Sequence, residues 1–325
     1  MRICVVGPGA VGGNLAARLA RSGVAVSVVA RGANLEAIRA NGLRVVAGDE
    51  TIAARVHASD DPRSLGPPDA VFVTVKAPAL PAVVPQILPL LGPDTPVVFA
   101  LNGIPWWYHL ELARRGHAVR ARLDPEGLLR DRIGLERTIG CIIYSSNEVL
   151  SPGVIRNHAA GGNRFVLGEP GGEASERCAT LSALMTGAGL EAPVTTAIRT
   201  EIWKKLLLNI AIAGPCCLTG SNQRQLAANA ELRALCLALL AEVRAVAAAH
   251  GALIATEPAQ MLPRELPAHK PSLLQDLERG RAMEIDAIFV AASDFARAAD
   301  LATPMLDSIV ALLMQRAAIA GLYQP

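Results

Sequence analysis

Residues 3–12, ICVVGPGAVG, decide the fold of this chain. An apolar run over residues 3–6 leads directly into the glycine-rich turn Gly7-Pro8-Gly9-Ala10-Val11-Gly12. The glycines of a GxGxxG turn allow a tight bend, a close backbone approach to a pyrophosphate and close packing of the next helix on the strand. The N–H groups and the positive dipole end of that helix favour an anion. The stretch therefore predicts a βαβ unit that binds a dinucleotide.

The end of the second predicted strand, residues 24–30, indicates which dinucleotide. An NAD site usually carries an acid there, which holds the ribose 2′-hydroxyl. This chain has Arg31 followed by Gly32, and its next acid is Glu36. Because a guanidinium fork matches a phosphate, we predict NADP, with Arg31 on the 2′-phosphate. A solvated charge at the end of the strand is the alternative for Arg31.

The first half of the chain alternates strand and helix patterns, which is typical of a parallel, doubly wound sheet. We expect strands at 2–6, 24–30, 69–75 and 95–100, and helices at 10–21, 33–41 and 78–91. An irregular insertion follows Gly103, and further short strands are expected at 139–144, 153–156, 164–167 and 191–195, with a helix at 173–187. These segments make a Rossmann-type NADP-binding domain over residues 1–196.

Beyond residue 196 the β pattern stops. Alanine- and leucine-rich helical patterns occupy 197–212, 229–250, 271–279, 282–299 and 304–320. We therefore predict a helical domain for substrate and dimer contacts over residues 197–325. The fold class is α/β, an N-terminal doubly wound sheet followed by an all-helical domain. The apolar helices are compatible with a monomer or a homodimer.

Composition narrows the function classes. The 325 residues carry a net charge of +2, and no basic tract alternates with aromatics, so we expect no nucleic-acid partner. A strand beginning at residue 2 and the lack of an apolar run of 18 residues argue against a signal peptide and a membrane span. Six cysteines without a CxxC pair predict buried thiols in the cytoplasm, and the spacing of the histidines predicts no metal site.

Polar residues that follow the strands are candidates for the reaction, because ligands bind beyond the carboxyl ends of parallel strands. Lys76 follows the run 71–75, and Asn102 follows the run 97–101. They are suited to the nicotinamide ribose or to a substrate carboxylate. A solvent-exposed lysine and a simple Asn-Gly turn are the alternatives.

The helical half contributes Lys205 and Asn209, which are four residues apart and share one helix face. A lysine in a dry cleft can give a proton to a carbonyl oxygen as hydride reaches the carbon. Lys204 is rotated about 100° away and is expected to be solvated. Ser272 and Glu284 stand near the starts of two later helices, where helix capping is the alternative role.

The chain resembles the ketopantoate reductase (2-dehydropantoate 2-reductase) family over nearly its whole length. The resemblance rests on the glycine turn with Arg31 and on five later motifs in order: Val75-Lys76-Ala77, Leu101-Asn102-Gly103, Trp203 to Asn209, Ser272 to Asp276 and Glu284-Ile285-Asp286.

The resemblance implies NADPH-dependent reduction of a 2-keto acid, in a cleft between a Rossmann domain and a helical domain. By residue matching, Lys205 is the general acid, and Glu284 engages the substrate and supports the lysine. Asn102, Asn209 and Ser272 contact substrate. The cofactor residues are Gly7, Gly9, Ala10, Val11, Gly12, Arg31, Lys76 and Asn102.

Two features bear on the substrate. The family commonly has a second asparagine before a proline where this chain has Ala213. Ketopantoate is therefore one candidate substrate, and other branched or aromatic 2-keto acids are the alternative. Trp106, Trp107 and Tyr108 either wall an apolar pocket or form packing. A noncatalytic NADP sensor is the third reading, and the presence of both Lys205 and Glu284 argues against it.

Overall fold

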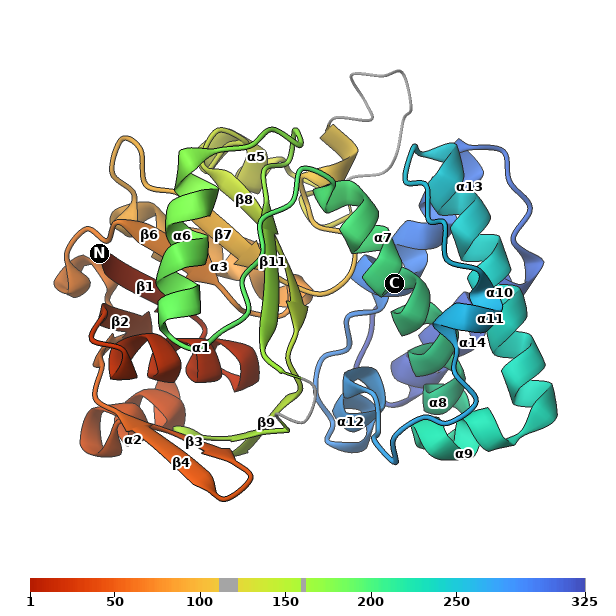
Figure 1. Cartoon of the computed structure of the whole chain (residues 1–325), viewed down its shortest axis with the longest axis horizontal. Coiled ribbons are helices and arrows are strands. Elements are labelled where there is room, and N and C mark those ends of the chain that lie inside the picture. Colours follow the sequence, from red (N-terminus) through yellow and green to blue (C-terminus); the bar gives the residue numbers. More distant parts are fainter. Residues whose placement is uncertain (111–121, 159–161, 325) are drawn as a thin grey trace. The chain divides into compact units, whose positions relative to one another are not determined.

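The computed structural model describes residues 1–110, 122–158 and 162–324, and the chain forms two compact units (Figure 1). Unit 1 contains Met1–Leu101 and Glu126–Ile198, and unit 2 contains Asn102–Pro125 and Arg199–Pro325. The α/β fold class with a helical C-terminal part is confirmed. Our division into 1–196 and 197–325 differs from these units in the segment Asn102–Pro125, which belongs to unit 2. Its described residues include Tyr108, whose ring packs against Trp203 and Phe295.

The main sheet of unit 1 has seven strands in the order β11-β8-β7-β6-β1-β2-β5. All neighbours are parallel except the pair β8 and β11. The strands are β1 (Arg2–Val6), β2 (Ala25–Val29), β5 (His57–Ser59), β6 (Ala70–Val73), β7 (Val97–Ala100), β8 (Thr138–Tyr144) and β11 (Arg164–Gly168). Every residue of β6 and β7 is buried, as expected of central parallel strands covered on both faces.

The helices of unit 1 follow the predicted pattern closely, except that α5 and the turn η1 were not predicted. They are α1 (Ala10–Arg21), α2 (Gly32–Asn41), α3 (Leu80–Ile87), α5 (Leu128–Arg132) and α6 (Glu176–Gly187), with 3₁₀ turns η1 (Pro62–Leu65), η2 (Ala77–Ala79) and η3 (Leu88–Leu90). The short strand expected at 191–195 exists only as isolated bridges from Glu191 and Val194 to β11.

A second sheet, in the order β4-β3-β10-β9, was largely missed by the sequence analysis, which expected strands only at 153–156. Its strands are β3 (Leu43–Ala47), β4 (Glu50–Ala54), β9 (Asn147–Ser151) and β10 (Val154–Asn157). The sheet packs on α1. A Cβ at Gly13 of α1 would lie 2.6 Å from Ile155 Cδ1. Close packing on this sheet therefore holds the helix that follows the glycine turn.

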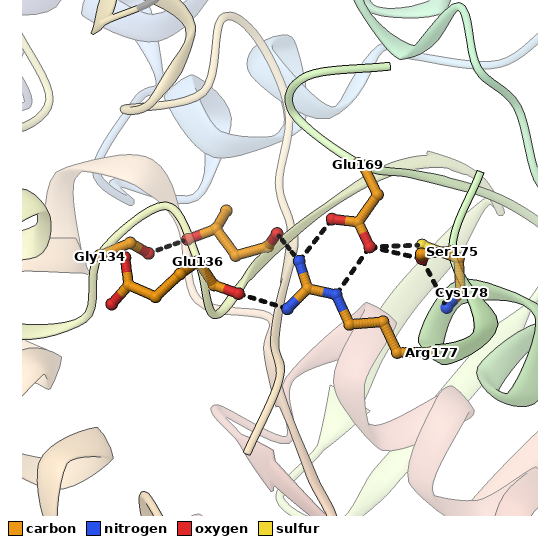
Figure 2. A network of polar contacts seen from close by, with 7 residues as sticks. Gly134, Glu136, Glu169, Ser175, Arg177 and Cys178 are labelled. Carbon is orange, nitrogen blue, oxygen red and sulfur yellow. Dashed lines mark hydrogen bonds and ion pairs between the residues drawn. The ribbon is translucent and has the colours of Figure 1, made fainter. Parts of the chain in front are cut away.

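A buried ion pair connects the end of β11 to α6 (Figure 2). Glu169 is 1% exposed, and its Oε1 accepts hydrogen bonds from Arg177 Nε at 2.7 Å and from the Ser175 hydroxyl. Arg177 also donates to the carbonyl oxygens of Glu136 and Thr138. Burial alone would raise the pKa of Glu169, but the hydrogen bonds from Arg177 and Ser175 lower it below the usual value. Glu169 therefore stays a carboxylate in the interior.

Unit 2 contains helices and connecting loops, with no strand among its described residues. Its elements are α7 (Ile198–Leu208), η5 (Asn209–Ala213), α8 (Gly214–Thr219), α9 (Gln223–Ala228), α10 (Ala230–Ala249), α11 (Pro258–Met261), α12 (Ser272–Glu278), η6 (Asp286–Val290), α13 (Ala291–Ala298) and α14 (Pro304–Ile319). The segments η5 and η6 are π-helical turns. In Figure 1 the labelled helices of this unit run from green to blue.

The helix predicted at 197–212 continues to Thr219, because α7, η5 and α8 form one run of 22 residues. Pro215 does not end the run, because its missing N–H falls at the start of α8, directly after the wider π turn. Contrary to our expectation, this run is long and apolar enough to cross a membrane by length and composition alone. Its most apolar window is 61% buried inside the structure, as in the core helix of a folded domain.

Candidate active site

The glycine turn of unit 1 has the steric requirements that its sequence predicted. Gly7 has a φ of +85°, and a Cβ there would lie 2.5 Å from Val75 Cγ1. A Cβ at Gly12 would lie 2.1 Å from Thr74 Oγ1. At Gly9, by contrast, the nearest atom to an added Cβ is the Gly7 carbonyl oxygen at 3.9 Å. Two glycines thus pack against β6 and its end, and the middle one leaves open space where a ligand can approach the backbone.

Two side chains that the sequence analysis overlooked hold this turn in place. The Thr74 hydroxyl, just past β6, donates to the Gly7 carbonyl oxygen at 2.8 Å. Asn34, in α2, donates from Nδ2 to the Pro8 carbonyl oxygen at 3.1 Å and accepts from the Gly153 N–H at 2.9 Å. The signal was present in the sequence, since Thr74 follows a buried strand and Asn34 follows Arg31 by three residues.

The residues of unit 1 fit the diphosphate and the 2′-phosphate of NADP. No side chain caps the N-terminus of α1, and no acid lies in its first turn, so the N–H groups of Ala10 and Val11 are suited to an anion. Arg31 is exposed at the end of β2, where it precedes the first residue of α2. Lys76 is half-buried just past β6. The donor set is cationic and N–H rich, as a dinucleotide phosphate requires.

Three polar residues from three separate segments meet in unit 2. Lys205 of α7 donates from Nζ to Asn102 Oδ1 at 2.7 Å. Asn102 in turn donates from Nδ2 to Glu284 Oε2 at 3.1 Å. Glu284 is 6% exposed and stands just before the helical run that contains η6. We call Lys205, Asn102 and Glu284 the polar triad. Asn102 and Glu284 are 182 positions apart in the sequence, so the triad joins distant parts of the chain.

The partners of Asn102 dictate which way its amide faces. A carboxylate can only accept hydrogen bonds, so it takes the amide NH₂ group. An ammonium can only donate, so it takes the amide oxygen. The amide therefore links a cation to an anion through two hydrogen bonds. This arrangement keeps the ammonium of Lys205 hydrogen-bonded to Asn102, and the buried carboxylate of Glu284 orients Asn102.

The remaining candidates of unit 2 lie on neighbouring elements. Asn209 is half-buried and begins η5, one turn after Lys205. Ser272 is exposed at the first position of α12, and it makes no cap hydrogen bond there. Lys204 pairs with Glu201 at 2.5 Å, and its side chain is 43% exposed, in line with the solvated role expected for it. Asn209 and Lys204 lie on the same helical run as Lys205, whereas Ser272 lies on α12.

The aromatic residues after Asn102 form packing in unit 2. Trp106, Trp107 and Tyr108 are each 1% exposed or less. The Tyr108 hydroxyl accepts a hydrogen bond from Trp203 Nε1 at 2.8 Å, and its ring packs edge-on against Phe295. The packing alternative is therefore confirmed for these side chains. Through the contact between Tyr108 and Trp203 they pack against α7, directly before Lys204 and Lys205 in the sequence.

Comparison with known proteins assigns the family. The family model described as "Ketopantoate reductase PanE/ApbA" matches residues 3–172, and the model of its C-terminal part matches residues 197–317. The chain is 42% identical to the 2-dehydropantoate 2-reductase of Mesorhizobium japonicum, across 99% of this chain and 100% of that protein.

Two solved structures show the same fold. The 2-dehydropantoate 2-reductase of Geobacter metallireducens is 29% identical, with a TM-score of 0.84 over 97% of this chain and 99% of that one. A D-mandelate dehydrogenase with NADH and anilino(oxo)acetate is 21% identical, with a TM-score of 0.84 over 99% and 100%, and so shows the fold alone. With two family models spanning most of its length and a close full-length relative, the chain belongs to the ketopantoate reductase PanE/ApbA family.

Proposed function

We propose that this protein is an NADPH-dependent oxidoreductase that reduces 2-dehydropantoate to pantoate, a step of pantothenate biosynthesis. The observation that carries the proposal is the polar triad, in which a lysine ammonium is held by an amide that is itself held by a buried carboxylate. The full-length relative named 2-dehydropantoate 2-reductase supports the choice of substrate.

In this proposal unit 1 binds the cofactor. The backbone of the glycine turn from Gly7 to Gly12 binds the diphosphate, and Arg31 binds the 2′-phosphate. Lys76 serves the nicotinamide end. NADPH bound there supplies the hydride that reduces the keto carbon.

Lys205 supplies the proton. As the keto carbon gains a hydride, its oxygen gains negative charge, which an ammonium stabilises and then neutralises by transfer of a proton. Asn102 fixes the direction of the ammonium through its 2.7 Å hydrogen bond. Glu284 fixes Asn102 and balances the charge of the lysine. Glu284 therefore supports Lys205 through the amide.

Asn102, Asn209 and Ser272 are proposed to bind the substrate. Amides and hydroxyls are suited to the carboxylate and hydroxyl of a hydroxylated 2-keto acid. Ala213 ends η5, where an asparagine would offer a further amide, and it is 7% exposed. Its apolar side chain is the observation that favours the second candidate substrate class, a branched or aromatic 2-keto acid without the hydroxyl of 2-dehydropantoate.

The deciding experiment is the initial rate of NADPH oxidation with 2-dehydropantoate, 2-ketoisovalerate and phenylglyoxylate in one assay. We expect kcat/KM to be highest for 2-dehydropantoate, on the order of 10⁴ M⁻¹s⁻¹ or more. A preference for either of the other acids would assign the same chemistry to a different substrate. NADPH binding without turnover of any of the three would favour a sensor.

Replacing the proton donor tests the mechanism. We expect Lys205→Ala to lower kcat by about 10³-fold or more, because the oxygen of the substrate then lacks its proton source. NADPH affinity, measured by fluorescence titration, should stay within about threefold. The matched control is Lys204→Ala, since this neighbouring lysine pairs with Glu201 instead of the triad. Equal losses in the two variants would contradict the role of Lys205.

We further propose a cytoplasmic homodimer. All six cysteines are free and buried, which suits a reducing compartment. One relative of the same fold is described as a dimeric ketopantoate reductase from Staphylococcus aureus, and sedimentation of the purified protein tests whether this chain also pairs.

A further inference from the structure

The segment that carries Asn102 lies directly on the π turn η6. The Ile104 N–H donates to the carbonyl oxygen of Ala287 at 2.7 Å. Gly103, between Asn102 and Ile104 in the sequence, has a φ of +80°. A Cβ at Gly103 would lie 2.4 Å from the Ala287 carbonyl oxygen and 2.8 Å from Ala287 Cβ. Gly103 thus stands so close to η6 that there is no room for a side chain.

The π turn explains why Ala287 can accept this contact. Hydrogen bonds in a π turn run from i to i+5, so the ladder shifts by one residue where it joins an α-helix. A carbonyl within the shift is then available to a partner outside the helix, and the Ile104 N–H takes the carbonyl of Ala287. The contact therefore needs both features: the π turn makes the Ala287 carbonyl available, and Gly103 lets the segment come close to it.

We propose that Gly103 and Ala287 are positioning residues that set the distance between Asn102 and Glu284, an inference that rests on the proposed reaction. Asn102 immediately precedes Gly103, and Glu284 stands three residues before Ala287. The contact between Gly103 and Ala287 therefore fixes both ends of the 3.1 Å hydrogen bond from Asn102 to Glu284. Through Asn102 it also fixes the ammonium of Lys205.

The dimensions of the contact define what a side chain at position 103 would do. Real Cβ atoms essentially never come within 3.0 Å of a neighbour, whereas this one would meet a backbone oxygen at 2.4 Å. The segment must then move by about 0.6 Å, the difference between those distances. A shift of that size at Asn102, if directed along its bond to Glu284, would stretch the bond from 3.1 Å to about 3.7 Å, beyond hydrogen-bond range.

The test is Gly103→Ala beside the control Gly251→Ala. Gly251 has nearly the same φ, +81°, but nothing lies within 4 Å of a Cβ added there. Both variants place a side chain at nearly the same positive φ, and only Gly103→Ala forces the segment away from η6. We expect Gly103→Ala to lower kcat about 10- to 100-fold, since small misplacements of catalytic groups cost that much. The control should keep the wild-type kcat, and NADPH affinity should be unchanged in both.

A double-mutant cycle separates positioning from general damage to unit 2. In an Asn102→Ala background there is no amide left to position, so adding Gly103→Ala should lower kcat by less than twofold. A loss that multiplies with that of Asn102→Ala would overturn the proposal. So would a Gly103→Ala protein that loses activity only because it unfolds at a lower temperature than Gly251→Ala.

Ala287→Val approaches the same contact from the helix and gives a second variant. It should reproduce the fall in kcat and the dependence on Asn102. If it leaves kcat unchanged in a folded protein, the proposal is wrong. The readout also separates this inference from the proposed function: a wild-type protein that turns over none of the 2-keto acids refutes the function, whereas an active wild type with additive variants refutes only the positioning.

Discussion

At the scale of single residues, the polarity of Asn102 shows how a neutral side chain can connect two charges. Its oxygen faces the ammonium of Lys205 and its NH₂ group faces the carboxylate of Glu284. Aspartate at this position would place two carboxylates side by side, and leucine would leave both charges without this partner. An amide satisfies both neighbours at once, which explains why an asparagine suits this position.

Arg31 is the residue that we expect to decide between the two nicotinamide cofactors. We expect Arg31→Ala to raise the KM for NADPH about 10- to 100-fold, because a charge-assisted bond to the 2′-phosphate is lost. The KM for NADH should change little, and kcat should be nearly unchanged. Steady-state kinetics with both cofactors measures this shift.

Arg39→Ala is the matched control for Arg31, because Arg39 lies at the far end of the same helix and donates to the Ala58 carbonyl oxygen. It should leave the preference for NADPH intact. An unchanged NADPH preference in Arg31→Ala would show that Arg31 is the solvated strand-end charge that we named as its alternative.

At the scale of elements, the regular parts of unit 1 could be predicted from the sequence, and the irregular parts could not. The strands β1, β2, β6 and β7 are apolar runs bounded by polar or glycine residues, so their pattern was sufficient. The second sheet was missed because β3 and β4 mix buried with exposed residues, and because β3 pairs with β10, which is more than 100 residues later. The residue pattern within a segment does not predict which distant strand it pairs with.

The π turns were equally invisible to the sequence. Helical periodicity assumes 3.6 residues per turn, and η5 and η6 depart from it at Asn209–Ala213 and Asp286–Val290. Gly214 and Pro215 lie just beyond the predicted helix end at residue 212, where an end of the helix would be expected. Tertiary packing decided otherwise, because a Cβ at Gly214 would lie 2.9 Å from Ile309 and 3.0 Å from Phe289.

The join between β11 and α6 depends on the buried carboxylate of Glu169 (Figure 2). We expect Glu169→Gln to lower the free energy of unfolding of unit 1 by about 3 kcal/mol, because it removes one partner of a buried ion pair. The matched control is Glu173→Gln, an exposed residue of the same segment. Chemical denaturation at pH 7 measures both.

The same pair predicts how stability depends on pH. The folded protein holds the pKa of Glu169 below its usual value, so the contribution of Glu169 is present above the unfolded pKa of about 4.3. It is lost as the pH falls through the lower folded value. The stability difference between wild type and Glu169→Gln should therefore shrink from pH 5 toward pH 3. A difference that stays constant over that range would mean that the charge of Glu169 contributes nothing.

At the scale of the whole molecule, the predicted site residues divide between the two units. The glycine turn, Arg31 and Lys76 belong to unit 1, whereas Asn102, Lys205, Asn209, Ser272 and Glu284 belong to unit 2. The sequence identified these residues through motif spacing and family resemblance. It gave no sign that Asn102 belongs with the helices, since this residue follows a strand of the sheet by two positions.

The cysteines also divide evenly between the two units, so that the opening of each unit can be followed through its own thiols. Cys4, Cys141 and Cys178 lie in unit 1, and Cys216, Cys217 and Cys236 lie in unit 2. All six are buried, and burial raises the pKa of Cys4 to about 11 and that of Cys216 to about 12. At pH 8 the native thiols should therefore resist alkylation, and each should react only when its own unit opens.

A cofactor that binds unit 1 should protect the two sets of thiols unequally. A ligand at 100 times its Kd stabilises the state that binds it by about 2.7 kcal/mol. In a urea series with pulsed alkylation and peptide mapping, saturating NADPH should move the labelling of Cys4, Cys141 and Cys178 to higher urea. Cys216, Cys217 and Cys236 should move less, because unit 2 contributes no residue to the glycine turn. If all six thiols shift together, the units unfold as one cooperative body, and cofactor binding stabilises the triad as much as the turn.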